Sequence, residues 1–181
     1  MANKGKYYES QFEEATVELL REAHWQHTFG DDIHRKYTDP LIEEDLRNFL
    51  SVQYIDKDLT TNELDSIVAN LRNAGGQNDY YALRNTFLLY RDGYDFAYSD
   101  GRDNPFRLEY IDFKYPDHNV FRCVNQFVME QGRENRRPDI LLFINGIPVC
   151  IIELKNPTKQ NATIRDAHTQ ICTRYMRDIP A

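Results

Sequence analysis

Apolar side chains in the first half of the chain recur every three or four residues, the spacing of one face of a helix. This pattern predicts four helices: one over residues 11–23, one over 41–49, one that starts at the capping-box pair Thr60 and Glu63, and one over 80–90. We expect the helices of residues 40–92 to form an insertion between the first helix and a sheet.

From Tyr94 onward the apolar pattern changes from helical spacing to alternation, which is typical of strands. Strands are predicted over residues 94–98, 106–113 and 120–129, then a hairpin at Asn145-Gly146 between two apolar strands, and a closing helix over 163–177. The predicted fold class is α/β (mixed α+β), with a central mixed sheet flanked by helices. We expect a single domain over residues 1–181, whose core sheet and closing helix occupy 94–181.

Length and composition fit a globular protein, since 181 residues with 41% hydrophobic side chains can bury one substantial core. No apolar run approaches the roughly 20 residues needed to cross a bilayer, and the N-terminus lacks a signal-peptide core. We therefore expect a cytoplasmic protein with no membrane partner. Cys123, Cys150 and Cys172 match neither a disulfide framework nor a zinc pattern and are expected to be small, reduced core residues.

The net charge of −7 is unevenly distributed along the chain. Residues 1–130 carry 14 Lys and Arg against 24 Asp and Glu, whereas residues 131–181 carry 8 against 5. The basic excess of the last segment is where a nucleic-acid backbone would need it. Candidate phosphate contacts, each equally interpretable as a solvated surface charge, are Arg133, Arg136, Arg137, Lys159, Arg165 and Arg174.

Three charged residues, Asp139, Glu153 and Lys155, interrupt the two apolar strands. An ionised side chain in a buried strand is costly unless it is paired or binds a metal. Glu153 and Lys155 are two apart, so their side chains leave the same face of a strand. Two carboxylates on adjacent strands suit Mg²⁺ or Mn²⁺, with the backbone carbonyl of Leu154 as a further ligand. The alternative is an ordinary cross-strand salt bridge at a sheet edge.

Whether Asp139 joins Glu153 depends on the hairpin register. A two-residue loop puts Ile152 opposite Asp139 and sends Glu153 to the other face, whereas an odd-length loop puts Asp139 opposite Glu153. We expect the odd register, or an equivalent bulge or bend.

The segment from Pro138-Asp139 to Glu153-Leu154-Lys155 resembles the Pro-Asp/Glu-x-Lys signature of the restriction-endonuclease-like, or PD-(D/E)xK, nuclease superfamily. The surrounding sequence resembles, over essentially the whole chain, the N-terminal nuclease domain of the restriction (R) subunit of type I restriction-modification enzymes. The runs that carry this likeness include Asn125-Gln126-Phe127, Asn145-Gly146-Ile147-Pro148, Ile152-Glu153-Leu154-Lys155-Asn156-Pro157 and Ala167-His168-Thr169-Gln170-Ile171.

The resemblance implies a type I site-specific deoxyribonuclease domain with a restriction-endonuclease-like core that cleaves double-stranded DNA. Asp139 and Glu153 would bind Mg²⁺ or Mn²⁺, Lys155 would assist the attacking water, and Glu9 or Glu13 would approach the metal from the first helix. The implied partners are methyltransferase and specificity subunits. Because the chain lacks a phosphate-binding loop, we expect a fragment of a longer ATP-binding motor subunit.

The resemblance also implies a Gln-x-x-x-Tyr pair on the closing helix that positions DNA or the catalytic lysine, but Gln170 and Tyr175 are five apart. At about 100° per residue they diverge by roughly 140° on an α-helix. Either the helix carries a one-residue bulge, or only one of the two residues does the family's work. The alternative functions are a stand-alone repair or defence nuclease, and a catalytically weak domain that docks onto DNA or partner subunits.

Overall fold

The computed structural model describes residues 9–74, 80–102, 104–155 and 163–175. The chain divides into two compact units. The first unit comprises Met1–Pro40, Phe121–Phe143 and Pro148–Ile179, and the second comprises Leu41–Val120, Ile144–Ile147 and Pro180–Ala181. The organisation as a single domain stays a prediction.

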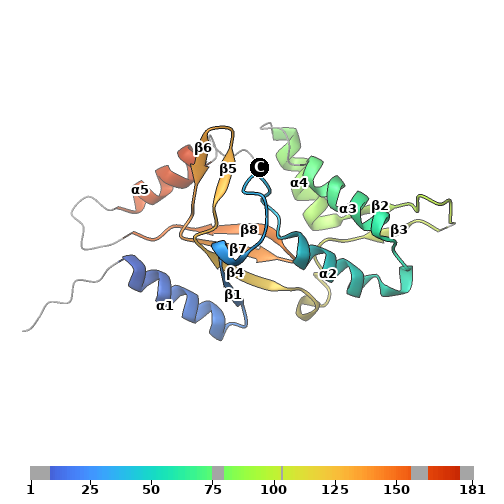
Figure 1. The fold of residues 1–181 in the computed structure, drawn as a ribbon, viewed down its shortest axis with the longest axis horizontal. Coiled ribbons are helices and arrows are strands. Elements are labelled where there is room, and N and C mark those ends of the chain that lie inside the picture. Colours follow the sequence, from blue (N-terminus) through green and yellow to red (C-terminus); the bar gives the residue numbers. More distant parts are fainter. Residues whose placement is uncertain (1–8, 75–79, 103, 156–162, 176–181) are drawn as a thin grey trace, which may run out of the picture. The chain divides into compact units, whose positions relative to one another are not determined.

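A four-stranded mixed sheet is the centre of the first unit (Figure 1), and its strand order is β1-β4-β7-β8. β1 runs parallel to β4, with His27 beside Cys123 and Phe29 beside Asn125. The predicted mixed α and β fold class is therefore confirmed. The elements of this unit are α1 (Glu9–Glu22), β1 (Gln26–Phe29), β4 (Phe121–Asn125), β5 (Met129–Gln131), β6 (Glu134–Arg136), β7 (Ile140–Ile144), β8 (Ile147–Ile152), α5 (Ile164–Thr169) and the π-helical segment η4 (Gln170–Tyr175).

Helix α1 packs on the sheet through its apolar face (Figure 1). Val17 is buried against Cys123 of β4 and Ile140 of β7. Further apolar side chains pack around this cluster, namely Leu20, Trp25, Leu142, Ile152 and Leu154. The apolar spacing thus predicted the helix but not its buried face, since Val17 and Leu20 contact the cluster whereas Leu19 is 66% exposed.

The second unit is mainly helical, with a core that includes Leu46, Leu50, Ile67 and Tyr110. β2 and β3 pair antiparallel with each other in a separate two-stranded sheet, so the strands expected over 94–113 lie outside the four-stranded sheet. The elements of this unit are α2 (Glu43–Gln53), α3 (Thr61–Ala74), α4 (Tyr80–Asp92), β2 (Tyr94–Phe96) and β3 (Phe106–Leu108).

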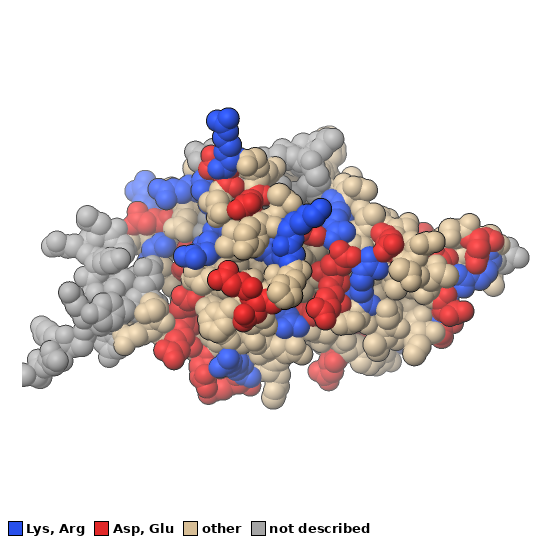
Figure 2. Space-filling view, viewed as in Figure 1, with Lys and Arg blue, Asp and Glu red and all other residues tan. Residues whose placement is uncertain are grey.

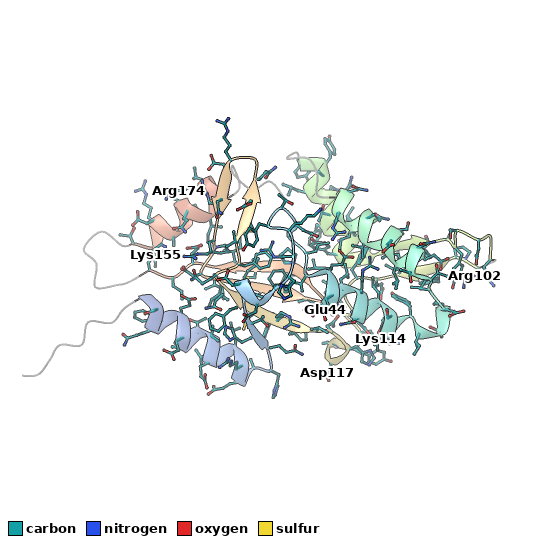
Figure 3. The ribbon with its side chains drawn as sticks, in the orientation of Figure 1. Glu44, Arg102, Lys114, Asp117, Lys155 and Arg174 are labelled. Atoms are coloured by element: carbon teal, nitrogen blue, oxygen red, sulfur yellow. The ribbon has the colours of Figure 1, made fainter. Side chains whose placement is uncertain are left out.

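The predicted capping box at the start of α3 is confirmed. The Thr60 N–H donates to Glu63 Oε2 at 2.9 Å, and the Glu63 N–H donates to Thr60 Oγ1 at 3.3 Å. The Arg102 guanidinium also donates to both Glu63 carboxylate oxygens at 3.0 Å. Because Glu63 is only 2% exposed, these partners offset the cost of burying its charge. Figure 3 labels Arg102.

Glu63 should make the second unit sensitive to acid. The hydrogen bond from the Thr60 N–H, with help from Arg102 and against the opposing effect of burial, lowers the pKa of Glu63 below its ordinary value. The ionised carboxylate therefore stabilises the fold above the unfolded-state pKa, and this contribution is lost as the pH falls through the folded-state pKa. We expect the denaturation midpoint of the wild type to fall more steeply than that of Glu63→Gln below about pH 5.

Denaturant titrations followed by circular dichroism at several pH values measure this difference. Glu44→Gln, which removes an exposed carboxylate of the same unit, serves as the control. Parallel pH profiles for the wild type and Glu63→Gln would contradict the assignment.

Two of the three cysteines are not core residues. Cys123 is buried in β4, but Cys150 and Cys172 are exposed, so the expectation for these two is wrong. The reason for Cys150 is that β8 is an edge strand, where an apolar run is not enclosed on both sides. Among the described residues, no helix has the length and apolar character to cross a membrane.

Candidate active site

Asp139 lies immediately before β7 and is held at two points. Its Oδ2 accepts a hydrogen bond from the Leu154 N–H at 2.7 Å, and its backbone carbonyl accepts one from the Gln126 N–H at 3.2 Å. The preceding Pro138 is buried and Asp139 is half-buried. The carboxylate is therefore fixed against the backbone of the segment that carries Glu153 and Lys155.

The turn between β7 and β8 is a two-residue loop, so the expectation of an odd-length loop is wrong. Asn145 and Gly146 both have left-handed backbone conformations, with φ of 52° and 75°. This is the type I′ turn that matches the twist of antiparallel strands. With regular pairing, such a loop would place Ile152 opposite Asp139 and on the other face from Ile140.

The pairing is not regular, because β8 contains an irregularity of the kind expected as the alternative to an odd loop. Val149 and Cys150 are consecutive exposed residues, which breaks the alternation of a strand. Beyond them, Ile152 and Leu154 pack in the same cluster as Ile140, on the side of α1. By alternation, the residue between Ile152 and Leu154 points to the opposite face. A bulge-like shift in β8 thus returns residue 153 to the face required by the motif.

The Glu153 side chain is almost fully shielded from solvent, with 1% of it exposed. Its Oε2 accepts a hydrogen bond from Gln170 Nε2 at 2.8 Å and lies 3.5 Å from Lys155 Nζ. Lys155, labelled in Figure 3 beyond the end of β8, is 23% exposed. The structure therefore brings Glu153, Lys155 and Gln170 together. Asp139 joins them through its hydrogen bond from the backbone N–H of Leu154, which lies between Glu153 and Lys155 in the chain.

Gln170 begins the π-helical segment η4, which ends at Tyr175. Backbone hydrogen bonds in a π-helix join residues five apart, so backbone positions separated by five residues lie nearly above one another. The open question of the five-residue spacing is answered in favour of a bulge in the helix. Whether Gln170 and Tyr175 act as the family pair stays a prediction.

The donor set is suited to a hard divalent cation, since Asp139 and Glu153 supply carboxylate oxygens and the Leu154 backbone adjoins both. Within the described ranges, no group of three or more His, Cys, Asp or Glu side chains is close enough to hold a metal ion, so no third acidic residue joins Asp139 and Glu153. Glu13 of α1 instead faces the end of β4, and the side chain of Glu9 lies outside the described part of the chain.

Glu13, which the resemblance placed near the metal, instead belongs to a polar network with two amides that the sequence did not predict. Asn125 Nδ2 donates to Glu13 Oε1 at 2.8 Å, and Gln126 Nε2 donates to the same oxygen at 3.2 Å. Gln126 has a φ of 60°, a conformation that non-glycine residues adopt rarely and often near functional sites. Since its N–H also holds the Asp139 carbonyl, Gln126 links α1 to the candidate site. The available sequence signal was the pair of consecutive amides that interrupts the strand predicted over 120–129.

Comparison with known proteins places the sequence in a family. The family model described as "Type I restriction enzyme R protein N terminus" matches residues 6–181, nearly the entire chain. The chain belongs to this family. It therefore corresponds to the N terminus of the type I restriction enzyme R protein.

Relatives of this R protein domain are named as endonuclease subunits of type I restriction enzymes. The chain is 27% identical over 176 residues to the type I restriction enzyme HindI endonuclease subunit of Haemophilus influenzae, covering 91% of the chain and 16% of that subunit. It is 46% identical over 76 residues to the putative type I restriction enzyme MjaIXP endonuclease subunit of Methanocaldococcus jannaschii, covering 40% of the chain and 7% of that subunit. The R protein domain thus spans a small part of these relatives. No solved structure matches it significantly.

Proposed function

We propose that this domain is a metal-dependent endonuclease that hydrolyses phosphodiester bonds of double-stranded DNA. The observation that carries the proposal is the shielded Glu153 carboxylate, which is held by Lys155 and Gln170 next to the backbone that binds Asp139. A buried carboxylate with an adjacent ammonium and a second acid across a hairpin is costly to build unless it serves chemistry. The names of the relatives, all endonuclease subunits, support the same function.

In this proposal Asp139 and Glu153 hold Mg²⁺ or Mn²⁺, and the backbone carbonyl of Leu154 completes the protein ligands. When bound, such an ion supplies an acidified water and neutralises charge on the attacked phosphate. The cytoplasmic location, the methyltransferase and specificity partners, and an ATP-driven motor elsewhere in the subunit belong to the same proposal.

The chain's own groups prepare the site before any substrate arrives. The Leu154 N–H fixes one oxygen of Asp139, and Gln170 fixes one oxygen of Glu153, so neither carboxylate has to reorganise. The Lys155 ammonium, near Glu153 and partly exposed, is placed to orient a water and to stabilise negative charge that develops on the phosphate. Gln170 is then a positioning residue and Lys155 a catalytic one.

Asp139→Asn tests the metal-binding part of this proposal. The substitution keeps the shape of the side chain but removes its charge, so Mg²⁺ affinity should fall by about tenfold or more. Isothermal titration calorimetry measures the affinity, and cleavage of linear and circular duplex DNA in the presence of Mg²⁺ or EDTA measures activity. Asp117→Asn, at an exposed aspartate of the second unit, is the matched control.

Equal Mg²⁺ affinities for the wild type and Asp139→Asn would remove Asp139 from the ligand set. A wild-type domain that binds duplex DNA but neither binds nor responds to a divalent ion would instead favour a domain that only docks. Cleavage restricted to the ends of linear DNA would favour a stand-alone exonuclease.

A further inference from the structure

The hairpin of β5 and β6, here called the ribbon, projects from the first unit (Figure 1) and is followed in the chain by Asp139 of the candidate site. Its two strands pair from Met129 with Arg136 to Gln131 with Glu134. Gly132, with a φ of 61°, and Arg133 form the tip, the glycine-first arrangement of a type II′ turn. All residues from 130 to 135 are exposed. The ribbon thus presents both faces to solvent, although isolated two-stranded ribbons are marginally stable.

The base of the ribbon is anchored firmly. The Glu130 N–H donates to the Tyr37 carbonyl at 2.9 Å, and Met129 is only 8% exposed. The Arg35 guanidinium lies 3.4 Å from the centre of the Phe127 ring and also donates to the Val128 carbonyl. After Arg136 the chain continues directly into the segment that ends at Asp139. A fixed base therefore joins the ribbon to the candidate site.

The charges of the ribbon leave arginines available to an anion. The acidic side chains are engaged within the ribbon, since Arg136 donates to Glu134 at 3.0 Å and Asn135 donates to Glu130 at 3.2 Å. Arg133 and Arg137 are exposed, and neither pairs with a carboxylate in the part of the chain that the structure describes. Figure 2 shows basic side chains at the free end of the ribbon and over α5.

We propose that the ribbon is a contact arm for duplex DNA, with Arg133 at its tip and Arg137 at its base binding backbone phosphates. A two-stranded ribbon has the width that the major groove of B-DNA admits, and its polar surface has no apolar face to bury against protein. Because the base runs into Asp139, phosphates held by Arg137 would be presented close to the candidate site. This inference rests on the proposed nuclease function, which supplies the duplex as partner.

The salt dependence of DNA binding tests the proposal. Affinity of the full 181-residue chain for a random-sequence duplex is measured in EDTA, which prevents cleavage, over a series of salt concentrations. Each lost phosphate contact should reduce the slope of log K against log salt by about 0.9. We expect that reduction for Arg133→Ala and about twice that for the Arg133→Ala/Arg137→Ala double variant. Gly132 is retained, so the turn is preserved.

Arg84→Ala is the matched control, because Arg84 is an exposed arginine of α4 with no carboxylate partner among the described residues. Its slope should equal that of the wild type. If both ribbon variants have the same slope as the wild type and still cleave DNA in the presence of Mg²⁺, the contact arm is overturned and the nuclease proposal stands. Reduced slopes in the two ribbon variants, together with a wild-type chain that does not cleave DNA, would support the contact arm and overturn the nuclease proposal. Absence of duplex binding by the wild-type chain would overturn the arm.

Discussion

Replacing Glu153 with glutamine is expected to reduce Mg²⁺-dependent DNA cleavage by about 100-fold or more while the fold remains intact. Glutamine has nearly the same shape, so the space between Lys155 and Gln170 stays filled. The substitution removes the negative charge that a divalent ion needs, and it places a neutral amide beside the Lys155 ammonium. The loss should therefore appear in the rate of cleavage and in Mg²⁺ affinity, with little change in circular dichroism.

Cleavage of supercoiled plasmid by equal amounts of wild type and variant measures the effect. Glu22→Gln, which neutralises an exposed glutamate of the same unit outside the site and the ribbon, should retain activity. If Glu153→Gln cuts as fast as the wild type at every Mg²⁺ concentration, the shielded carboxylate is structural and the assignment of the active site fails.

Substitution of Gly146 by alanine is expected to lower the free energy of unfolding by about 3 kcal/mol or more. Gly146 has a φ of +75°, and a Cβ atom there would lie 2.1 Å from the Ile42 carbonyl oxygen. That carbonyl is backbone at the start of α2, so it cannot rotate away as a side chain could. The Gly146 carbonyl also accepts the Ile42 N–H at 2.9 Å, which ties the turn to the same residue.

Gly101→Ala separates the clash from the backbone strain. Gly101 has a similar φ of +78°, but a Cβ there would meet nothing within 4 Å. The Gly101→Ala substitution should lower the free energy of unfolding by only about 1 kcal/mol, the strain of a left-handed non-glycine residue. Chemical denaturation of both variants provides the comparison. Equal losses would show that contact with Ile42 does not govern the turn.

The sequence was most informative where local rules act alone. The Thr60 and Glu63 capping box depends only on neighbours in sequence and formed as predicted. The hairpin turn also lies at Asn145-Gly146 as predicted, but it has two residues instead of an odd number. β1 was not predicted, since four residues with mixed polarity form a strand only because β4 lies beside them. The edge position of β8 was likewise invisible, because apolar composition does not reveal which strand lacks a neighbour.

For the candidate site, the sequence predicted the charged residues, but it left open whether an odd-length loop or a bulge brings them together. Charges inside apolar strands mark Asp139, Glu153 and Lys155, whereas the shift in β8 that directs Glu153 depends on packing against α1. The left-handed Gln126 could not be predicted either. It lies close to Gly30, which is distant in sequence, and a Cβ on Gly30 would come within 2.4 Å of the Gln126 carbonyl oxygen.

The π-helical segment η4 has a consequence for how this chain relates to the Gln-x-x-x-Tyr pattern that it resembles. An inserted residue in an ordinary helix rotates everything after it by about 100°. A π-turn absorbs the insertion locally, so position 175 keeps the angular phase that a four-residue spacing would give it. Because π-turns are rarer and less regular than α-turns, this segment gives up some helix stability for a backbone in which Gln170 and position 175 are nearly aligned.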